Sequence, residues 1–349
     1  MQRKEIYNLQ IIRGIAALLV VFEHLLPKEI GKFVPQGQIG VSMFFFISGF
    51  VMIYSFKENE SGISFFKRRI ERIYPAYIIL SLPLIIYFSF ISGSAQYLFH
   101  NLSLIAFFEW VPEQPAYNFV IRSNASPVAW TLYFEMFFYF IFAFSKYLSK
   151  TKIGVATITT SSILLILIVS NYIYGNSKHL GWQDVSYINI FSNLSLTSFV
   201  AGMLFPLLWN LNSNKKLSLA VFIIPLLSWL SLKISGKFFP AAFSNEQIKD
   251  IIFSSIPSWI FVALLISAKR FSGFVFDRLH HIGMISYSLY LFHANFYILK
   301  GVLDLGSYNI FIQMLFFIIT FTLSIFVANI SFNKIERLKF KPLSSIKTA

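Results

Sequence analysis

Two ionisable side chains share one face of an apolar segment near the start of the sequence. The segment is LQIIRGIAALLVVFEHLL, residues 9–26, and it contains Arg13 and His24. A spacing of eleven residues corresponds to three helical turns within about 20° and a rise of roughly 16 Å, so a helix points both side chains the same way. A guanidinium binds phosphate or carboxylate, and an imidazole acts as a general base or a nucleophile.

If this segment crosses a membrane, the shared face should line a polar cavity. A charged side chain in the bilayer costs about 3 kcal/mol or more unless it faces a polar interior. The alternative is that Arg13 reaches the inner lipid headgroups and His24 the outer ones. Glu23 points about 100° away from His24 on a helix, so we leave it outside the predicted site.

A carboxylate lies in a second apolar stretch, SPVAWTLYFEMFFY, residues 126–139. Ser126 before Pro127 predicts a helix start, with the hydroxyl as cap and the proline in the first turn. Glu135 then falls two turns inside the apolar zone. A carboxylate at that depth needs a partner or a proton, which makes it a candidate functional group. A structural ion pair with another span is the alternative.

Two aromatic side chains accompany that carboxylate. Trp130 lies about one turn before Glu135, and Tyr139 lies one turn after it. Both are candidates for lining the same cavity.

A second histidine lies in ISYSLYLFH, residues 285–293. His293 falls near the middle of a predicted span, and Tyr290 and Ser286 precede it on roughly the same face. Such polar groups either line a cavity or tie helices together. No histidine and carboxylate residues show metal-ligand spacing, so we expect no metal site.

Three arginines lie in FFKRRIERIYPAY, residues 65–77. Arg68 and Arg72 are one helical turn apart, Arg69 lies beside them, and Pro75 suits the first turn of a following helix. Such a cluster commonly orients the chain and anchors it to lipid headgroups. The functional alternative is a set of guanidinium groups that binds a phosphorylated ligand from the cytosol.

Composition identifies the elements that must position these residues. The 349 residues are 56% hydrophobic and 13% charged, and 42 of them are Phe, with a mean hydropathy of +0.66. A soluble domain could not bury so much apolar surface, and the apolar runs have the length of membrane helices. The sequence therefore predicts an all-α polytopic transmembrane bundle that forms a single domain over residues 1–349. With no Cys, disulfides and thiolate sites are excluded.

About ten spans follow from the apolar runs. They are predicted at 9–26, 39–56, 73–92, 127–147, 153–173, 189–209, 217–234, 250–268, 283–299 and 309–331. The stretch 97–110 is apolar but short and is followed by acidic residues and prolines, so we expect a re-entrant or interfacial segment there.

The basic residues indicate the orientation. With both termini cytoplasmic, about 20 of the 29 Lys and Arg residues fall in inner segments and about 8 in outer ones. The net charge of +14 then reflects topology and attraction to anionic membrane lipid, and we do not expect nucleic-acid binding.

Taken in order, these motifs resemble those of the acyltransferase-3 family of integral membrane acyltransferases. The resemblance rests on Arg13 with His24, FFFISGF at 44–50, RRIERIYPAY at 68–77, SPVAWTLYFE at 126–135 and SYSLYLFH at 286–293. The family's usual Trp-Ser-Leu is Trp130-Thr131-Leu132 here, which keeps the hydroxyl.

The resemblance implies an enzyme of the bacterial cytoplasmic (inner) membrane. Such an enzyme takes an acyl group, usually acetyl, from cytoplasmic acyl-coenzyme A to a hydroxyl of a cell-surface polysaccharide or lipid-linked sugar. The SGNH-type domain fused to many relatives is not expected here. Any partner that completes the transfer, such as another polysaccharide-assembly protein, would be a separate chain.

Roles for the candidate residues follow as hypotheses. Arg68, Arg69 and Arg72 would hold the nucleotide phosphates of acetyl-coenzyme A, and Arg13 would contact its pyrophosphate or the start of its arm. His24 would act at the thioester, as general base or transient acyl carrier.

Glu135 would orient His24 or deprotonate the acceptor itself. Trp130 and Tyr139 would stack on a sugar or pack the cavity. The rival hypothesis is a transporter or flippase that uses Glu135, His24 and Arg13 as a relay, although the sequence lacks paired halves. A non-catalytic scaffold is a third possibility.

Overall fold

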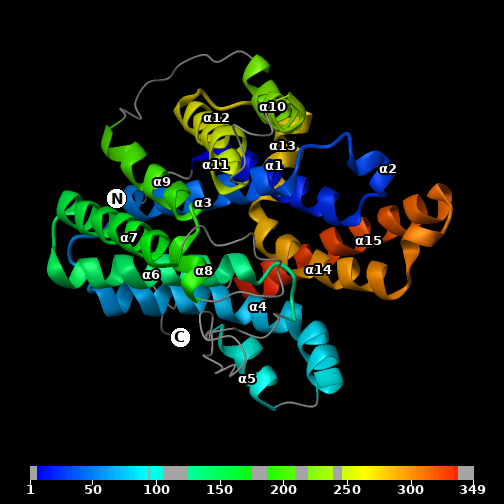
Figure 1. The fold of residues 1–349 in the computed structure, drawn as a ribbon, viewed down its shortest axis with the longest axis horizontal. Helices are drawn as coiled ribbons and strands as arrows, with labels where there is room; N and C mark the ends of the chain where they lie inside the picture. Colours follow the sequence, from blue (N-terminus) through cyan, green and yellow to red (C-terminus); the bar gives the residue numbers. More distant parts are fainter. Residues whose placement is uncertain are drawn as a thin grey trace, which may run out of the picture.

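The structure is a computed structural model, and it describes residues 6–92, 95–104, 125–174, 187–208, 219–238 and 246–336. Within these residues the fold is helical and contains no strand (Figure 1). The principal helices are α1 (Tyr7–Leu25), α3 (Gly37–Tyr54), α4 (Gly62–Ser92), α6 (Trp130–Leu148), α7 (Lys152–Tyr174), α9 (Leu196–Leu208), α10 (Ile224–Phe238), α12 (Ile256–Ser267), α13 (Phe274–Met284), α14 (Ser286–Val302) and α15 (Ile310–Ser331).

Shorter elements connect these helices. They are α2 (Lys28–Gly31), α5 (Ala95–Ser103), α8 (Tyr187–Ser192), α11 (Glu246–Asp250), the 3-10 turns η1 (Leu219–Ile223) and η3 (Leu305–Ser307), and the π-helical turns η2 (Ile251–Ser255) and η4 (Phe332–Glu336). Helix α5 covers part of the predicted re-entrant stretch 97–110, and residues 105–110 lie outside the described residues.

Six helical segments are long and apolar enough to cross a membrane, or seven if a bent pair counts as one span. The six include α1, α3, α4 and α7, together with 247–267 and 310–336. The pair is α13 and α14, which meet at 75°. These segments make the chain a multi-pass membrane protein.

The other three predicted spans are helical but do not meet the same criteria. Helix α6 carries Glu135 and Lys146, while α9 and the helical stretch 221–231 are short. Ten spans and cytoplasmic termini therefore remain predictions.

Two predicted helix starts are wrong. Helix α4 begins at Gly62, eleven residues before the predicted 73, so the arginines lie within it and Pro75 is an interior residue. The Ser61 hydroxyl accepts a hydrogen bond from the Ser64 N–H at 3.2 Å, which caps the earlier start.

Helix α6 begins at Trp130, after a turn formed by residues 127–129. Ser126 does not cap it. The Ser126 hydroxyl is buried and has no hydrogen-bond partner among the described residues, and its backbone carbonyl, not its side chain, accepts from the Ala129 N–H at 3.0 Å.

The central helices α1 and α3 pack through glycines. A Cβ on Gly283 of α13 would lie 1.8 Å from the Gln10 carbonyl oxygen of α1, and one on Gly14 of α1 would lie 2.2 Å from the Leu279 oxygen of α13. Between α3 and α9, Gly49 and Gly202 are equally close to the opposite backbone. Small residues let membrane helices approach closely, which places α1 and α3 in the core of the fold.

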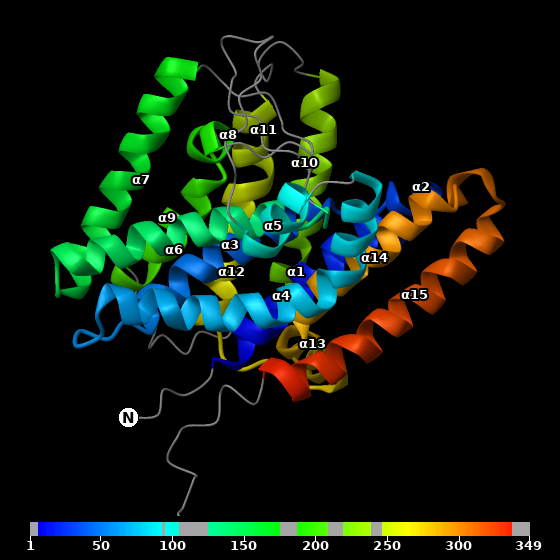
Figure 2. The same cartoon turned by 90° about the horizontal axis from the view of Figure 1, so that it is seen from below.

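Two ends of the bundle concern function. We call one the arginine end; it holds Arg68, Arg69 and Arg72 with Glu336 of η4. We call the other the histidine end; it holds His24 and Lys300. Helix α1 runs from the first end to the second (Figure 2).

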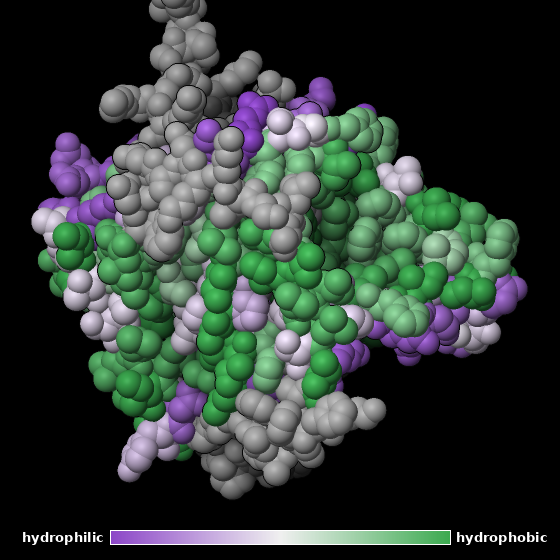
Figure 3. All heavy atoms as spheres, turned by 90° about the horizontal axis from the view of Figure 1, so that it is seen from above, coloured by the Kyte–Doolittle hydropathy of each residue, from purple (hydrophilic) through white to green (hydrophobic). Residues whose placement is uncertain are grey.

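The outer surface carries many apolar side chains. Exposed Ile, Leu, Phe and Val residues line α4, α7 and α15. The face in Figure 3 is largely apolar, with polar residues gathered toward its margins. This distribution suits a surface that contacts lipid.

Candidate active site

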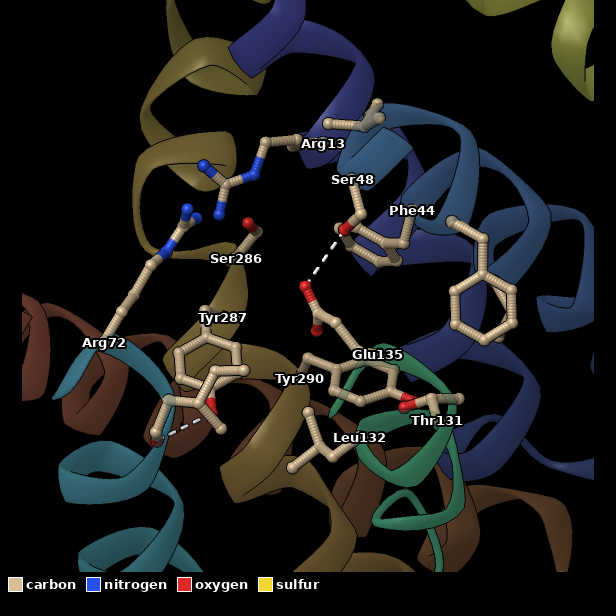
Figure 4. A pocket seen from close by; sticks show the side chains of 14 residues that line it. Arg13, Phe44, Ser48, Arg72, Thr131, Leu132, Glu135, Ser286, Tyr287 and Tyr290 are labelled. Carbon is tan, nitrogen blue, oxygen red and sulfur yellow. Dashed lines mark hydrogen bonds between the residues drawn. The ribbon is translucent and has the colours of Figure 1, made fainter. Parts of the chain in front are cut away.

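An inner cavity of about 90 Å³ lies between α1, α3, α4, α6 and α14. Arg13 of α1 and Arg72 of α4 both line it, and their guanidinium groups point toward one another beside Ser286 (Figure 4). Arg13 donates to the Gln10 side chain at 3.2 Å. Within the described part of the chain neither guanidinium forms a salt bridge. Two such cations beside one cavity are suited to binding an anion.

Glu135 of α6 enters the same cavity from the opposite side (Figure 4). Its carboxylate accepts a hydrogen bond from the Ser48 hydroxyl of α3 at 3.0 Å, and another from the Tyr139 hydroxyl one turn along α6. Thr131 and Tyr290 line the same cavity, with their hydroxyls 2.9 Å apart. The Glu135 carboxylate therefore has hydrogen-bond partners, as expected for a carboxylate in the apolar zone.

A mouth of about 290 Å³ lies at the arginine end, and Arg72 lines both the mouth and the inner cavity. Arg69 is only 7% exposed there, and its guanidinium lies 5.1 Å from the ring centre of Phe65 and 5.2 Å from that of Tyr139. Its Nε has no partner among the described residues. Arg68 also lines the mouth but pairs with Glu60 at 2.8 Å.

His24 and His293 contact each other outside the inner cavity. His24 Nδ1 of α1 lies 2.9 Å from His293 Nε2 of α14, and the ring centres are 5.2 Å apart. His293 is completely buried, and its Nδ1 lies 3.2 Å from the Leu289 carbonyl oxygen. The ring of Tyr297 lies 4.6 Å from that of His24.

A large outer cavity of about 1120 Å³ opens at the histidine end, and His24 lines it. Aromatic and charged side chains surround the rest of this cavity, among them Tyr297, Trp229, Lys28, Lys32, Lys233, Glu29 and Asp304. An aromatic surface with hydrogen-bonding groups around it suits a polar organic ligand.

The structure brings the predicted site residues together in two groups. Arg13, Arg72, Glu135 and Tyr290 share the inner cavity, while Arg68 and Arg69 lie at its mouth. His24 lines the outer cavity and contacts His293. Arg13 and His24 therefore do not line one common cavity, although they share a helix.

Four predicted roles have no support in this geometry. Glu135 contacts Ser48 and Tyr139 and does not meet His24. Trp130 packs against Phe45 and Phe134 and, like Ser126, lines none of these cavities. Tyr139 is buried between Glu135 and Arg69, which leaves no ring face for a sugar.

Sequence reasoning missed Ser48, which sits in the FFFISGF motif, and Lys300, whose ammonium binds the last carbonyls of α1. A lysine two turns after His293 on the same face was the available signal for the second. Among the residues that the structure describes, no three His, Asp or Glu side chains cluster as metal ligands would.

Comparisons with known proteins identify the family. The family described as an acyltransferase domain, acyltransferase-3, matches residues 6–330. The chain belongs to this family. It is therefore a member of an acyltransferase family and, by its helices, a membrane protein.

Curated relatives carry related names. The chain is 32% identical over 113 residues to acyltransferase MdmB of Streptomyces mycarofaciens. This match covers 30% of this chain and 27% of the relative. It is 28% identical over 196 residues to the exopolysaccharide production protein ExoZ of Rhizobium meliloti, covering 52% and 54%. It is 34% identical over 113 residues to nodulation protein 10 of Rhizobium leguminosarum bv. viciae, covering 29% and 30%. Each match thus spans about half or less of the relative. No solved structure matches the chain significantly.

Proposed function

We propose that this protein transfers an acyl group, most simply acetyl, from acyl-coenzyme A to a hydroxyl of a surface polysaccharide or lipid-linked sugar. The observation that carries the proposal is the arrangement of the cavities: a basic mouth and an inner cavity that share Arg72 in their linings, and an outer cavity at the opposite end of α1. Donor and acceptor would enter from opposite ends of the bundle, with the arginine end in the cytoplasm.

The mouth and inner cavity have the chemistry that a phosphorylated donor needs. Phosphate oxygens accept hydrogen bonds, and guanidinium groups bind them more strongly than neutral donors do. Arg69 presents an unpartnered buried Nε, and Ser286 presents an unpartnered buried hydroxyl beside Arg13 and Arg72. These unmet donors support a role for Arg13, Arg69 and Arg72 in holding the donor's phosphates, with Arg68 at the rim.

The outer cavity is the proposed site of the acceptor. Trp229 and Tyr297 offer aromatic faces, and charged groups of both signs can bind sugar hydroxyls. The exopolysaccharide and nodulation names of two relatives support a carbohydrate acceptor. His24, at the wall of this cavity, would act on the acceptor hydroxyl, and Glu135 would balance the arginines of the inner cavity.

The experiment is a comparison of surface polysaccharide from host cells with and without the gene. We expect base-labile acetate on the polysaccharide only where the intact gene is present. Purified protein in lipid nanodiscs should also bind acetyl-coenzyme A, and Arg13→Ala should weaken that binding. Esters that are independent of the gene, or no donor binding, would contradict the proposal. Gene-dependent glycan movement without ester formation would favour a transporter or flippase.

A further inference from the structure

The contact between His24 and His293 determines which nitrogen of each ring carries a proton. A carbonyl oxygen only accepts hydrogen bonds, so His293 Nδ1, 3.2 Å from the Leu289 oxygen, must be the donor there. A neutral imidazole has one N–H, and His293 Nε2 is therefore an acceptor. His24 Nδ1, 2.9 Å from that Nε2, must then donate.

The remaining nitrogen of His24 is thereby defined. With its proton on Nδ1, His24 holds a lone pair on Nε2, and this nitrogen forms no hydrogen bond with the described residues. His24 lines the outer cavity, whereas His293 is completely buried and lines none of the three cavities. His293 thus sits behind His24 as a carboxylate sits behind the histidine of a catalytic triad.

We propose that His293 is a positioning residue that fixes His24 with Nε2 as the base for the acceptor hydroxyl. The inference rests on the proposed function and deepens it. It also decides between the two roles open to His24, general base and acyl carrier, in favour of the base.

The chemistry balances without any further reactant. The acceptor O–H gives its proton to His24 Nε2 as its oxygen forms a bond to the acyl carbon. The C–S bond of the thioester breaks, and the proton passes from His24 to the departing thiolate, which leaves as the thiol. While His24 is cationic, its Nδ1–H remains bound to His293 Nε2, which stabilises the charge.

The arrangement of the cavities supports the base over the carrier. Arg13 and Arg72, the proposed donor-binding groups, line the inner cavity, and His24 does not. The hydrogen-bonded Tyr290 and Thr131 lie at that cavity's wall, and the ring centre of Tyr290 is 5.9 Å from that of His293. An acyl carrier would have to place Nε2 in bonding contact with the acyl carbon, whereas a base needs only hydrogen-bond reach of the acceptor hydroxyl and of the departing sulfur.

Three substitutions test the positioning role. In His293→Gln the amide oxygen can occupy the place of Nε2 and accept from His24, whereas the shorter side chain of His293→Asn reaches only the Leu289 side. We expect base-labile acetate on host-cell polysaccharide to fall at least about tenfold in the Asn and Ala variants and within about threefold in the Gln variant. His281→Asn, an exposed histidine on α13, is the matched control.

Two controls separate positioning from folding. Purified Asn and Gln variants should unfold at the same temperature and bind acetyl-coenzyme A as tightly as wild type. If His293 had only a structural role, the Gln and Asn variants would not differ in acetate while both still bound the donor fully. Equal acetate in the Asn variant and wild type would overturn the inference.

An exchange assay tests the choice of base over carrier. Purified wild-type protein is incubated with acetyl-coenzyme A and isotopically labelled coenzyme A without acceptor. A base predicts no exchange of label, because no acyl-enzyme forms; exchange that is abolished by His24→Ala would overturn the inference. If wild-type protein adds no acetate in cells and binds no donor, the proposed function itself fails, which is a different result from either outcome above.

Discussion

The ammonium of Lys300 lies 2.7 Å from the carbonyl oxygen of Leu26, at the end of the helix that carries His24. It also donates to the carbonyls of His24 at 3.2 Å and Leu25 at 3.3 Å. The last carbonyls of a helix lack intrahelical partners and attract cations. Because Lys300 and His293 are two turns apart on α14, this helix holds the end of α1 at two points.

Met is similar to Lys in length but has no N–H donor. Lys300→Met should therefore loosen the end of α1 while keeping most of the side-chain volume at this position. We expect amide hydrogen exchange to rise at residues 24–26 and 28, and ester formation to fall about tenfold because His24 is no longer held. Lys300→Arg, which keeps donors at this place, should restore most of the activity. Unchanged exchange in the Met variant would show that other contacts hold this turn.

The arginines of the mouth should differ in their contribution to donor binding. Arg72 faces both the mouth and the inner cavity, whereas Arg68 is half-exposed and paired with Glu60. A charge-assisted hydrogen bond contributes about 1.5–3 kcal/mol, so Arg72→Ala should weaken acetyl-coenzyme A binding by roughly 10- to 100-fold. Arg68→Ala should weaken it by less than about fivefold.

Titration calorimetry in nanodiscs measures both affinities, and the wild-type affinity should fall as salt rises. If the two variants lose the same affinity, the mouth acts through its overall positive charge and Arg72 makes no specific contribution.

The sequence predicted the class of fold, but it did not predict how the candidate site residues are arranged relative to one another. Hydrophobic runs predicted the positions of α1, α3, α7 and α15, because membrane helices need about twenty apolar residues. The start of α4 was missed because the arginines and other charged residues of its first three turns interrupt the apolar run.

Contacts between distant helices lay beyond helical periodicity. The rise from Arg13 to His24 was predictable from spacing alone, but the partner of His24 is 269 residues away in the sequence. The sequence around these residues does not indicate that His24 contacts His293 or that Glu135 contacts Ser48. Those pairings depend on how α1, α3, α6 and α14 pack, which in turn depends on glycine contacts that a single sequence does not identify.

The contact between Gly283 and α1 should tolerate no larger residue. A Cβ there would lie 1.8 Å from the Gln10 carbonyl oxygen, a backbone atom that cannot rotate away. Gly283→Ala should therefore separate α13 from α1 and destabilise the protein by about 1–3 kcal/mol. Thermal unfolding in nanodiscs, followed by tryptophan fluorescence, measures the effect. Gly301→Ala on α14 meets nothing within 4 Å and should not lower the unfolding temperature.

The orientation of the bundle can be tested because the chain contains no Cys. Single cysteines can therefore be labelled in intact cells with a maleimide that does not cross the inner membrane. Glu58 is exposed in the connection between α3 and α4, near the arginine end, and Lys32 is exposed after α2 at the histidine end. We expect Lys32→Cys to react in intact cells and Glu58→Cys to react only after lysis.

A third position, Lys269→Cys, tests the side on which α1 begins. The Lys269 carbonyl accepts from the Asn8 side chain at 3.1 Å, so this residue lies beside the first turn of α1. It is exposed and should behave like Glu58→Cys, reacting only after lysis. If Glu58→Cys and Lys269→Cys react in intact cells and Lys32→Cys does not, the bundle has the opposite orientation and the basic mouth lies outside. Coenzyme A is a cytoplasmic metabolite, so that result would also contradict the proposed route of the donor.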